Sequence, residues 1–139
     1  MKKQKSKLVR IMSENHPKNK FIPTIGEVRE WFKVINREIF DNALDDFREI
    51  EIKRRHGVWA ECWAFINTET GEKHSALSLN HYLKSKKHFI GVLAHEMIHH
   101  YQWTIAQTNM DHGETFFEWK SKLAKHKITL AINQKHPTH

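Results

Sequence analysis

The sequence predicts a single small α+β domain, and three features of the hydrophobic pattern indicate that fold class. Between residues 25 and 44 apolar side chains recur every three or four positions, which is the period of an amphipathic helix. Over residues 47–80 the period shortens to two, as in β-strands. Helical patterns return at 89–105 and from residue 114 onward. One helix, three strands and two helices in 139 residues predict an antiparallel-rich sheet packed on helices around one core.

The first helix is expected over residues 25–44. Thr24 stands just before it and is a candidate N-cap, because its hydroxyl can accept a hydrogen bond from a backbone N–H of the first turn. The apolar positions form a broad stripe that should face the core. The stripe consists of Trp31, Phe32, Ile35, Ile39 and Phe40.

Three strands are expected between this helix and the next, at residues 47–53, 58–67 and 75–80. The first alternates, with Ile50 and Ile52 on one face, so it should be half-buried. The second is apolar on both faces apart from Glu61, which predicts the central strand of the sheet. A turn at residues 68–72 joins the second strand to the third.

The most informative stretch is His95-Glu96-Met97-Ile98-His99, the H-E-x-x-H pattern that is typical of zinc peptidases. On a helix His95 and His99 lie about 40° apart, so both imidazoles can reach one metal ion. Glu96 falls about 60° beyond His99 around the helix axis. It could therefore take a proton from a metal-bound water without binding the ion itself, which predicts a catalytic role for Glu96.

An alternative is a core helix whose histidines are hydrogen-bonded to neighbours, because a chain with 12 histidines can produce this motif by chance. However, residues 89–105 are apolar in every direction around the helix, which indicates burial. Two imidazoles and a carboxylate buried without partners would cost several kcal/mol. A bound cation offsets that cost as their common partner, so the pattern favours a metal site.

A catalytic zinc usually has three protein ligands and keeps a fourth position for water, so a third ligand is expected downstream. His112 follows His99 by thirteen residues, enough for the helix to end near residues 108–109 and for the chain to turn back. Asp111 and Glu114 have the spacing of a capping box and predict the start of another helix. The same two carboxylates remain alternatives to His112 as the third ligand.

His95, Glu96 and His99, followed by His112, Gly113 and Phe116, form an H-E-x-x-H … H-G-x-x-F pattern. With this pattern the chain resembles the SprT-like zinc metalloproteases. The likeness extends upstream to the expected first helix and to the third strand, and it covers about residues 25 to 130. It implies a zincin-like metalloprotease core with one Zn²⁺ per chain, held by His95, His99 and His112.

The resemblance further implies hydrolysis of peptide bonds in proteins that are bound or cross-linked to DNA. Many relatives carry a cysteine-rich zinc ribbon after the protease core. This sequence has only Cys62, which cannot form such a ribbon and is interpreted as a buried thiol. Two alternatives stay open. One is a peptidase that acts on a single regulatory protein independently of DNA, and the other is a nucleic-acid-binding or adaptor protein in which zinc is structural.

Peptide hydrolysis also needs a group that stabilises the oxyanion, beyond what the ion itself supplies. His100 and Tyr101 are candidates, as are His81 and Tyr82, and the sequence does not choose among them. In zinc peptidases of this shape, a sheet edge beside the metal holds the substrate backbone as an added strand. Residues 77–80 are the expected edge.

The N-terminal segment carries most of the charge. Residues 1–20 contain seven cations and one acid, a net +6 of the chain's +7. One interpretation is an electrostatic arm for DNA, and the alternative is a solubilising tail. The basic face at residues 120–127 could extend such a surface. The cations proposed to contact nucleic acid are Lys2, Lys3, Lys5, Lys7 and Arg10.

The expected organisation is a flexible tail at residues 1–20, a metalloprotease domain at 21–132 and a short C-terminal tail at 133–139. The tail has too few apolar residues to join the core. Arg10 interrupts its short apolar runs, which excludes a signal-peptide core, and no run approaches the length of a membrane span. A cytoplasmic monomer that acts on a protein substrate and has no membrane partner is therefore expected.

Overall fold

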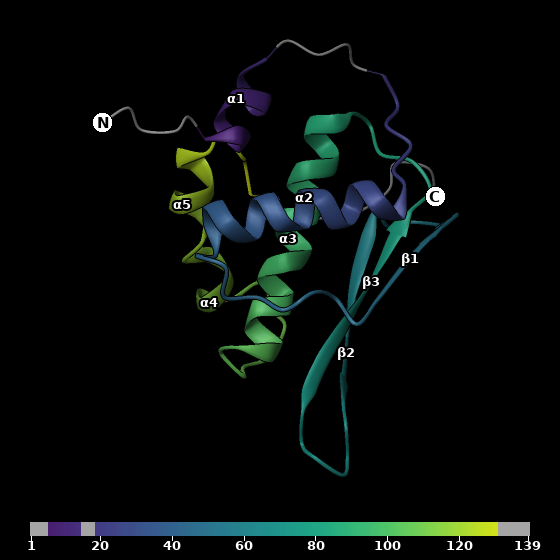
Figure 1. The fold of residues 1–139 in the computed structure, drawn as a ribbon, viewed down its shortest axis with the longest axis vertical. Helices are drawn as coiled ribbons and strands as arrows, with labels where there is room; N and C mark the ends of the chain where they lie inside the picture. The colour runs from purple at the N-terminus through teal and green to yellow at the C-terminus, as the bar shows by residue number, and fades with distance from the viewer. Residues whose placement is uncertain (1–5, 15–18, 131–139) are drawn as a thin grey trace.

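The computed structural model describes residues 6–14 and 19–130. The chain forms helices and a sheet of three strands, which lies beside the helices in Figure 1, so the α+β class is confirmed. The elements in chain order are α1 (Lys7–Ser13), α2 (Ile25–Ile39), β1 (Glu49–Lys53), β2 (Ala60–Ile66), β3 (Lys73–Asn80), α3 (Lys86–Thr104), α4 (Glu114–Phe117) and α5 (Lys120–Lys125). None of these helices is both long enough and apolar enough to cross a membrane.

α2 begins as predicted, at a capping box. The Thr24 hydroxyl accepts a hydrogen bond from the backbone N–H of Glu27 at 3.1 Å, and the Glu27 carboxylate accepts one from the N–H of Thr24 at 3.1 Å. The helix ends at Ile39, five residues before the predicted end. Asp41 and Asn42 there adopt φ of 52° and 61°, a left-handed conformation that these two residue types tolerate and that a helix cannot continue through.

The sheet has the order β1-β3-β2, with β1 parallel to β3 and β2 antiparallel to it. The sheet is therefore mixed, and the prediction of an antiparallel-rich sheet with residues 58–67 at its centre is wrong. The chain leaves β1, crosses the end of β3 through residues 54–59, and runs back along its far side as β2. That crossing spans two strand spacings, about 9.6 Å, which six residues cover easily.

Burial explains why the sequence pattern pointed to the wrong central strand. β2 is apolar, but its second half lies on a hairpin that projects from the helices, and Trp63 is 54% exposed there. β3 reads as partly polar, yet Ser75, Ser78 and Asn80 are all buried. Each of these three side chains is hydrogen-bonded, which removes the cost of burying it.

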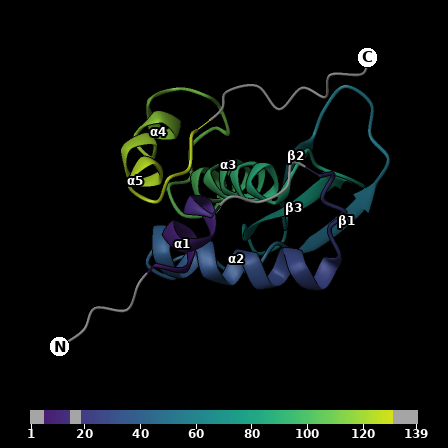
Figure 2. The ribbon, with the colours of Figure 1, turned by 90° about the horizontal axis from the view of Figure 1, so that it is seen from above.

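One face of the sheet is covered by α3, which packs on β2 and β3, and α2 lies across α3 (Figures 1 and 2). The register places Ile50, Leu77 and Cys62 side by side on one face, and Leu77 is 1% exposed. The prediction that Ile50 and Ile52 share one face of their strand is confirmed, because they lie beside Leu77 and Leu79 of β3. α3 is thus buried on the sheet, as its apolar composition predicted.

α1 is part of the core, contrary to the expectation that residues 1–20 contribute nothing to it. Leu8 is fully buried, because α1 packs on α2. The carboxylate of Glu38 in α2 accepts hydrogen bonds from the backbone N–H groups of Lys7 and Leu8, at 3.0 and 3.3 Å. An acid is favoured at that end of a helix, where free N–H groups gather. Lys2, Lys3, Lys5 and the expected C-terminal tail lie outside the described residues.

The segment after α3 differs from the prediction in its helix boundaries. α3 ends at Thr104, before the predicted 108–109, and the single expected helix is split into α4 and α5. Asp111 does not form the predicted capping box. Its carboxylate accepts a hydrogen bond from the N–H of Gly113 at 3.0 Å, two residues along the chain, and Gly113 is the N-cap of α4 without a side-chain cap.

Candidate metal centre

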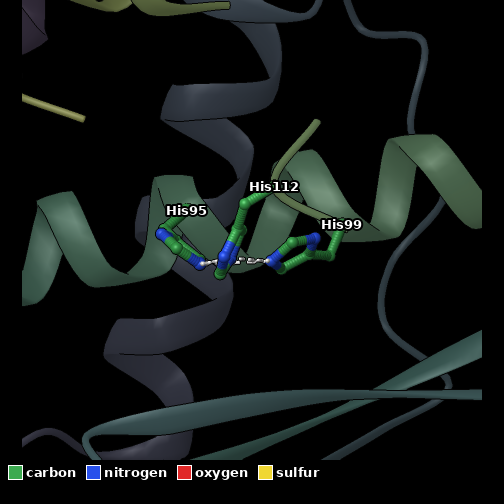
Figure 3. A group of neighbouring side chains, drawn as sticks. All are labelled: His95, His99 and His112. Carbon is green, nitrogen blue, oxygen red and sulfur yellow. Dashed lines mark hydrogen bonds between the residues drawn. The ribbon is translucent and has the colours of Figure 1, made fainter. Parts of the chain in front are cut away.

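α3 carries His95 and His99 on one side, one helical turn apart, and both are buried at 2% and 8% exposure. The chain then turns back, and the segment before α4 brings His112 to the same point. Figure 3 shows the three imidazoles directed toward one another. The sequence prediction that these three side chains come together is therefore matched by the geometry.

The three Nε2 atoms form a nearly equilateral triangle. They lie 3.1 Å apart for His95 and His99, and 3.2 Å apart for each of the two pairs with His112. A tetrahedral zinc with Zn–N bonds of about 2.0–2.1 Å would place its nitrogen ligands about 3.3–3.4 Å apart. The observed spacing is within about 0.2–0.3 Å of that value. These residues fit one metal ion, and they can hold it.

Gln102, which belongs to none of the sequence motifs above, fixes the ring of His99. Its side-chain Nε2 donates to the backbone carbonyl of Asp111 at 3.1 Å and to the Thr115 hydroxyl at 2.9 Å. Its Oε1 therefore faces Nδ1 of His99, at 2.9 Å, and accepts a hydrogen bond from it. Since Nδ1 of neutral His99 carries the proton, its Nε2 presents a lone pair toward the other histidines.

A sequence signal for Gln102 existed. It lies three residues after His99, a spacing that puts two side chains on the same side of a helix, and it is a polar residue in a helix predicted to be buried. Gln102 is fully buried, where an amide needs hydrogen-bond partners.

Glu96 lies beside the histidines without joining their triangle. Its Oε1 is 3.9 Å from Nε2 of His95, and the side chain is almost fully buried. Its Oε2 makes no hydrogen bond within the part of the chain that the structure describes. Burial, with a smaller contribution from the charge of Glu61, raises the pKa of Glu96 to about 8. A nearby cation would oppose this rise, because it favours the ionised carboxylate.

The histidines and Glu96 open into a cavity of about 300 Å³ between β2 and the segment before α4. β2 contributes Ala60, Glu61 and Cys62, and Met110 and Asp111 line the other side. The site is therefore a cleft that reaches the surface, with one wall formed by a strand. A purely structural metal site would not need such a cleft.

The two alternative third ligands do not join the triangle. The metal-binding group found among the described residues consists of the three histidines alone. Asp111 lines the cleft, but its carboxylate bonds to Gly113 and its carbonyl to Gln102. Glu114 is exposed in the first turn of α4.

The predicted oxyanion stabilisers are not brought to the cleft. One ring nitrogen of His100 pairs with Ser75, and the other donates to the carbonyl of Asp45 at 2.6 Å. Tyr101 packs against Phe40 and Trp119. Neither residue lines the cleft, and its nine lining residues include neither His81 nor Tyr82. Of the cations proposed to contact nucleic acid, Lys7 and Arg10 lie on α1.

Comparison with known protein families places the chain in a family. The sequence profile of the SprT-like family matches residues 28–136, which include α2 from its fourth residue onward, every later element through α5, and the three histidines. No curated protein and no solved structure matches the chain significantly.

Proposed function

The chain belongs to the SprT-like family, and from that premise and the geometry of its three histidines we propose that it is a zinc-dependent endopeptidase. The observation that carries the proposal is the buried Glu96 carboxylate beside the Nε2 triangle, in a cleft open to a peptide. A carboxylate that can accept a proton and a group of histidines that can hold a metal ion are both components of metal-assisted hydrolysis.

The proposed roles of the chain's own residues follow from their positions. His95, His99 and His112 would hold zinc, which supplies Lewis acidity and lowers the pKa of a coordinated water toward 7. Glu96 takes the proton that the water loses as its oxygen bonds to the peptide carbon. Glu96 then delivers that proton to the amine nitrogen as the carbon–nitrogen bond breaks.

The substrate strand needs a free sheet edge next to the cleft. Residues 77–80 cannot provide it, contrary to the sequence expectation, because β3 is paired with β1 on one side and β2 on the other. β2 lines the cleft with Ala60, Glu61 and Cys62, and its outer edge has no strand partner in residues 6–14 and 19–130. We therefore place the substrate backbone along β2, as an added strand.

The proposed substrates are proteins associated with DNA. This part of the proposal comes from the family resemblance. It is supported by the net +6 of residues 1–20, which would attract a nucleic acid. A structural-zinc adaptor is the alternative, and the buried Glu96 favours the enzyme. A structural site gains nothing from a carboxylate whose Oε2 has no partner among the described residues.

Cleavage of casein and of histones by the purified protein, with and without single-stranded DNA, tests the proposal. Glu96→Gln keeps the side chain's size but cannot accept the proton, so cleavage should fall at least about a hundredfold while bound zinc is unchanged. Glu118→Gln is a matched control, because Glu118 is exposed and lies outside the cleft. Zinc binding without cleavage of any substrate by the parent protein would favour the adaptor. Equal activity in parent and Glu96→Gln would remove Glu96 from catalysis.

A further inference from the structure

We propose that a second cavity, at the end of the sheet where β1 and β3 stop, binds a phosphate group. The cavity has a volume of about 360 Å³ and lies apart from the three histidines. Its walls come from the β1–β2 crossing, the segment after β3, and the residue before Phe21. They include Lys20, Arg54, Arg55, His56, His81 and Tyr82.

The charge of this cavity is one-sided. Three cations line it and no acid does. Arg55 is paired with Glu61 and also donates to the Ser78 hydroxyl. Lys20 lies over the Tyr82 ring, 4.5 Å from its centroid. Neither Lys20 nor Arg54 has a carboxylate partner within residues 6–14 and 19–130. Glu61, which lies outside the cavity, balances the charge of Arg55, so Lys20 and Arg54 leave two positive charges in the cavity. Two positive charges match a phosphate dianion.

The cavity is preformed, because one buried side chain fixes its walls. Asn80 is fully buried at the end of β3. Its Nδ2 donates to the carbonyls of Arg55 and Val58, at 3.2 and 3.1 Å, which anchors the crossing. Its Oδ1 accepts from Nδ1 of His81 at 3.0 Å, which orients that ring. A ligand would therefore meet cations whose backbone needs little rearrangement.

Phosphate is the ligand class that this chemistry favours. A guanidinium offers paired N–H donors to phosphate oxygens, and an ammonium adds a point charge. Because the backbone of the cations is fixed and no acid is among the lining residues, the cavity is selective for anions. Lys20 and Arg54, the two cations without a carboxylate partner among the described residues, favour a doubly charged anion. The phosphate could belong to a free small molecule or to a nucleic acid strand. Lys20 is also the last cation of the basic segment of residues 1–20. One nucleic acid strand could therefore contact the cavity and that segment together.

The cavity adjoins the cleft of the candidate metal centre through one ion pair. Arg55 lines the phosphate cavity, and its partner Glu61 lines the cleft. A bound phosphate group would therefore lie next to the site proposed for peptides. The inference does not depend on peptidase activity, because binding alone tests it.

The test is a titration of the zinc-loaded full chain with pyrophosphate, followed by calorimetry, and with a labelled single-stranded oligonucleotide, followed by anisotropy. The cavity variant is Lys20→Gln with Arg54→Gln. Its control, Lys33→Gln with Arg48→Gln, removes the same charge at exposed positions that do not line the cavity. Pyrophosphate should bind the cavity variant at least about tenfold more weakly than the parent, and the control variant within about twofold of it.

The oligonucleotide arm identifies the source of the phosphate. If the cavity variant also weakens oligonucleotide binding and lowers its salt dependence, the cavity takes a nucleic acid backbone. If the cavity variant binds pyrophosphate more weakly but binds the oligonucleotide as the parent does, the cavity takes a small free ligand. The inference is wrong if the parent binds neither probe, or if the two double variants lose affinity equally. Arg54→Gln alone, at an exposed position, replaces the double variant if the latter does not fold.

Discussion

The Oε1 atom of Gln102 lies 2.9 Å from Nδ1 of His99, and this contact decides which nitrogen of His99 can bind a metal. The two residues lie on the same side of α3, one turn apart. Because the amide nitrogen of Gln102 holds the carbonyl of Asp111, one side chain couples the metal helix to the residue before His112. Gln102 therefore supports two of the three expected ligands.

The first prediction concerns this support. Gln102→Met has a similar size but cannot accept the proton of His99 or hold Asp111, so zinc affinity should fall by about tenfold to a hundredfold. Competition with a chromophoric chelator would measure the affinity. Gln102→Glu is the informative companion, because it still accepts from His99 but cannot donate to Asp111. Its affinity should lie between those of the parent and Gln102→Met. Unchanged affinity in Gln102→Met would show that the contact is dispensable.

The second prediction concerns the third ligand. Metal analysis of the purified protein should find about one zinc per chain, and His112→Ala should lose most of it, because two histidines alone leave the ion weakly held. Glu114→Ala and Asp111→Ala should keep near-parent zinc content, since neither carboxylate belongs to the Nε2 triangle. The opposite pattern, with zinc retained in His112→Ala and lost in a carboxylate variant, would reassign the ligand.

The sequence predicted the site better than it predicted the sheet. His95 and His99 could be grouped from spacing, because the helical repeat fixes their positions. A short return path made His112 a candidate third ligand beside Asp111 and Glu114, and the family resemblance favoured the three histidines that the structure brings together. The buried α3 and the Thr24 cap were also readable, since both depend on local patterns. Gln102 was missed because its partners come from other segments.

The sheet order depended on tertiary contacts that no local pattern records. Hydrophobicity pointed to β2 as the centre, but Trp63 and its neighbours lie on an exposed hairpin. β3 occupies the centre because Ser75, Ser78 and Asn80 find hydrogen-bond partners in distant residues. In the same way, the burial of Leu8 follows from Glu38 capping α1, a contact across thirty residues of sequence.

The third prediction concerns stability toward acid. Burial lowers the pKa of His100, whose neutral ring lies between Ser75 and the Asp45 carbonyl. Below about pH 6.5 the unfolded chain therefore binds a proton that the folded chain resists. The stabilising effect of the neutral ring is complete above that pH. It is lost as the pH falls from there toward the lowered pKa.

Urea unfolding between pH 7.5 and 5 should show this loss, with chelator present so that metal release does not contribute. His100→Gln removes the titrating group, so the free energy of unfolding should fall less steeply with acid than in the parent. His126→Gln serves as the control, since His126 bonds to a carbonyl of its own helix. Equal slopes in the parent and His100→Gln would contradict the prediction.

The fourth prediction concerns α1, which the structure places in the core. Leu8→Ala removes a fully buried side chain between α1 and α2 and should lower the free energy of unfolding by about 2–5 kcal/mol. Arg10→Ala on the same helix is the control. Arg10 is exposed, so the change should stay within about 0.5 kcal/mol. Both values come from urea unfolding with zinc bound.

Glu38→Gln offers a second test of the same contact. The amide can still accept hydrogen bonds from the N–H groups of Lys7 and Leu8, but it lacks the negative charge that favours the N-terminal end of a helix. We expect a smaller loss than in Leu8→Ala, on the order of 0.5–1 kcal/mol. If Leu8→Ala is as stable as Arg10→Ala, α1 contributes nothing to folding in solution. A chain that starts after residue 14 would then keep the full stability of the parent.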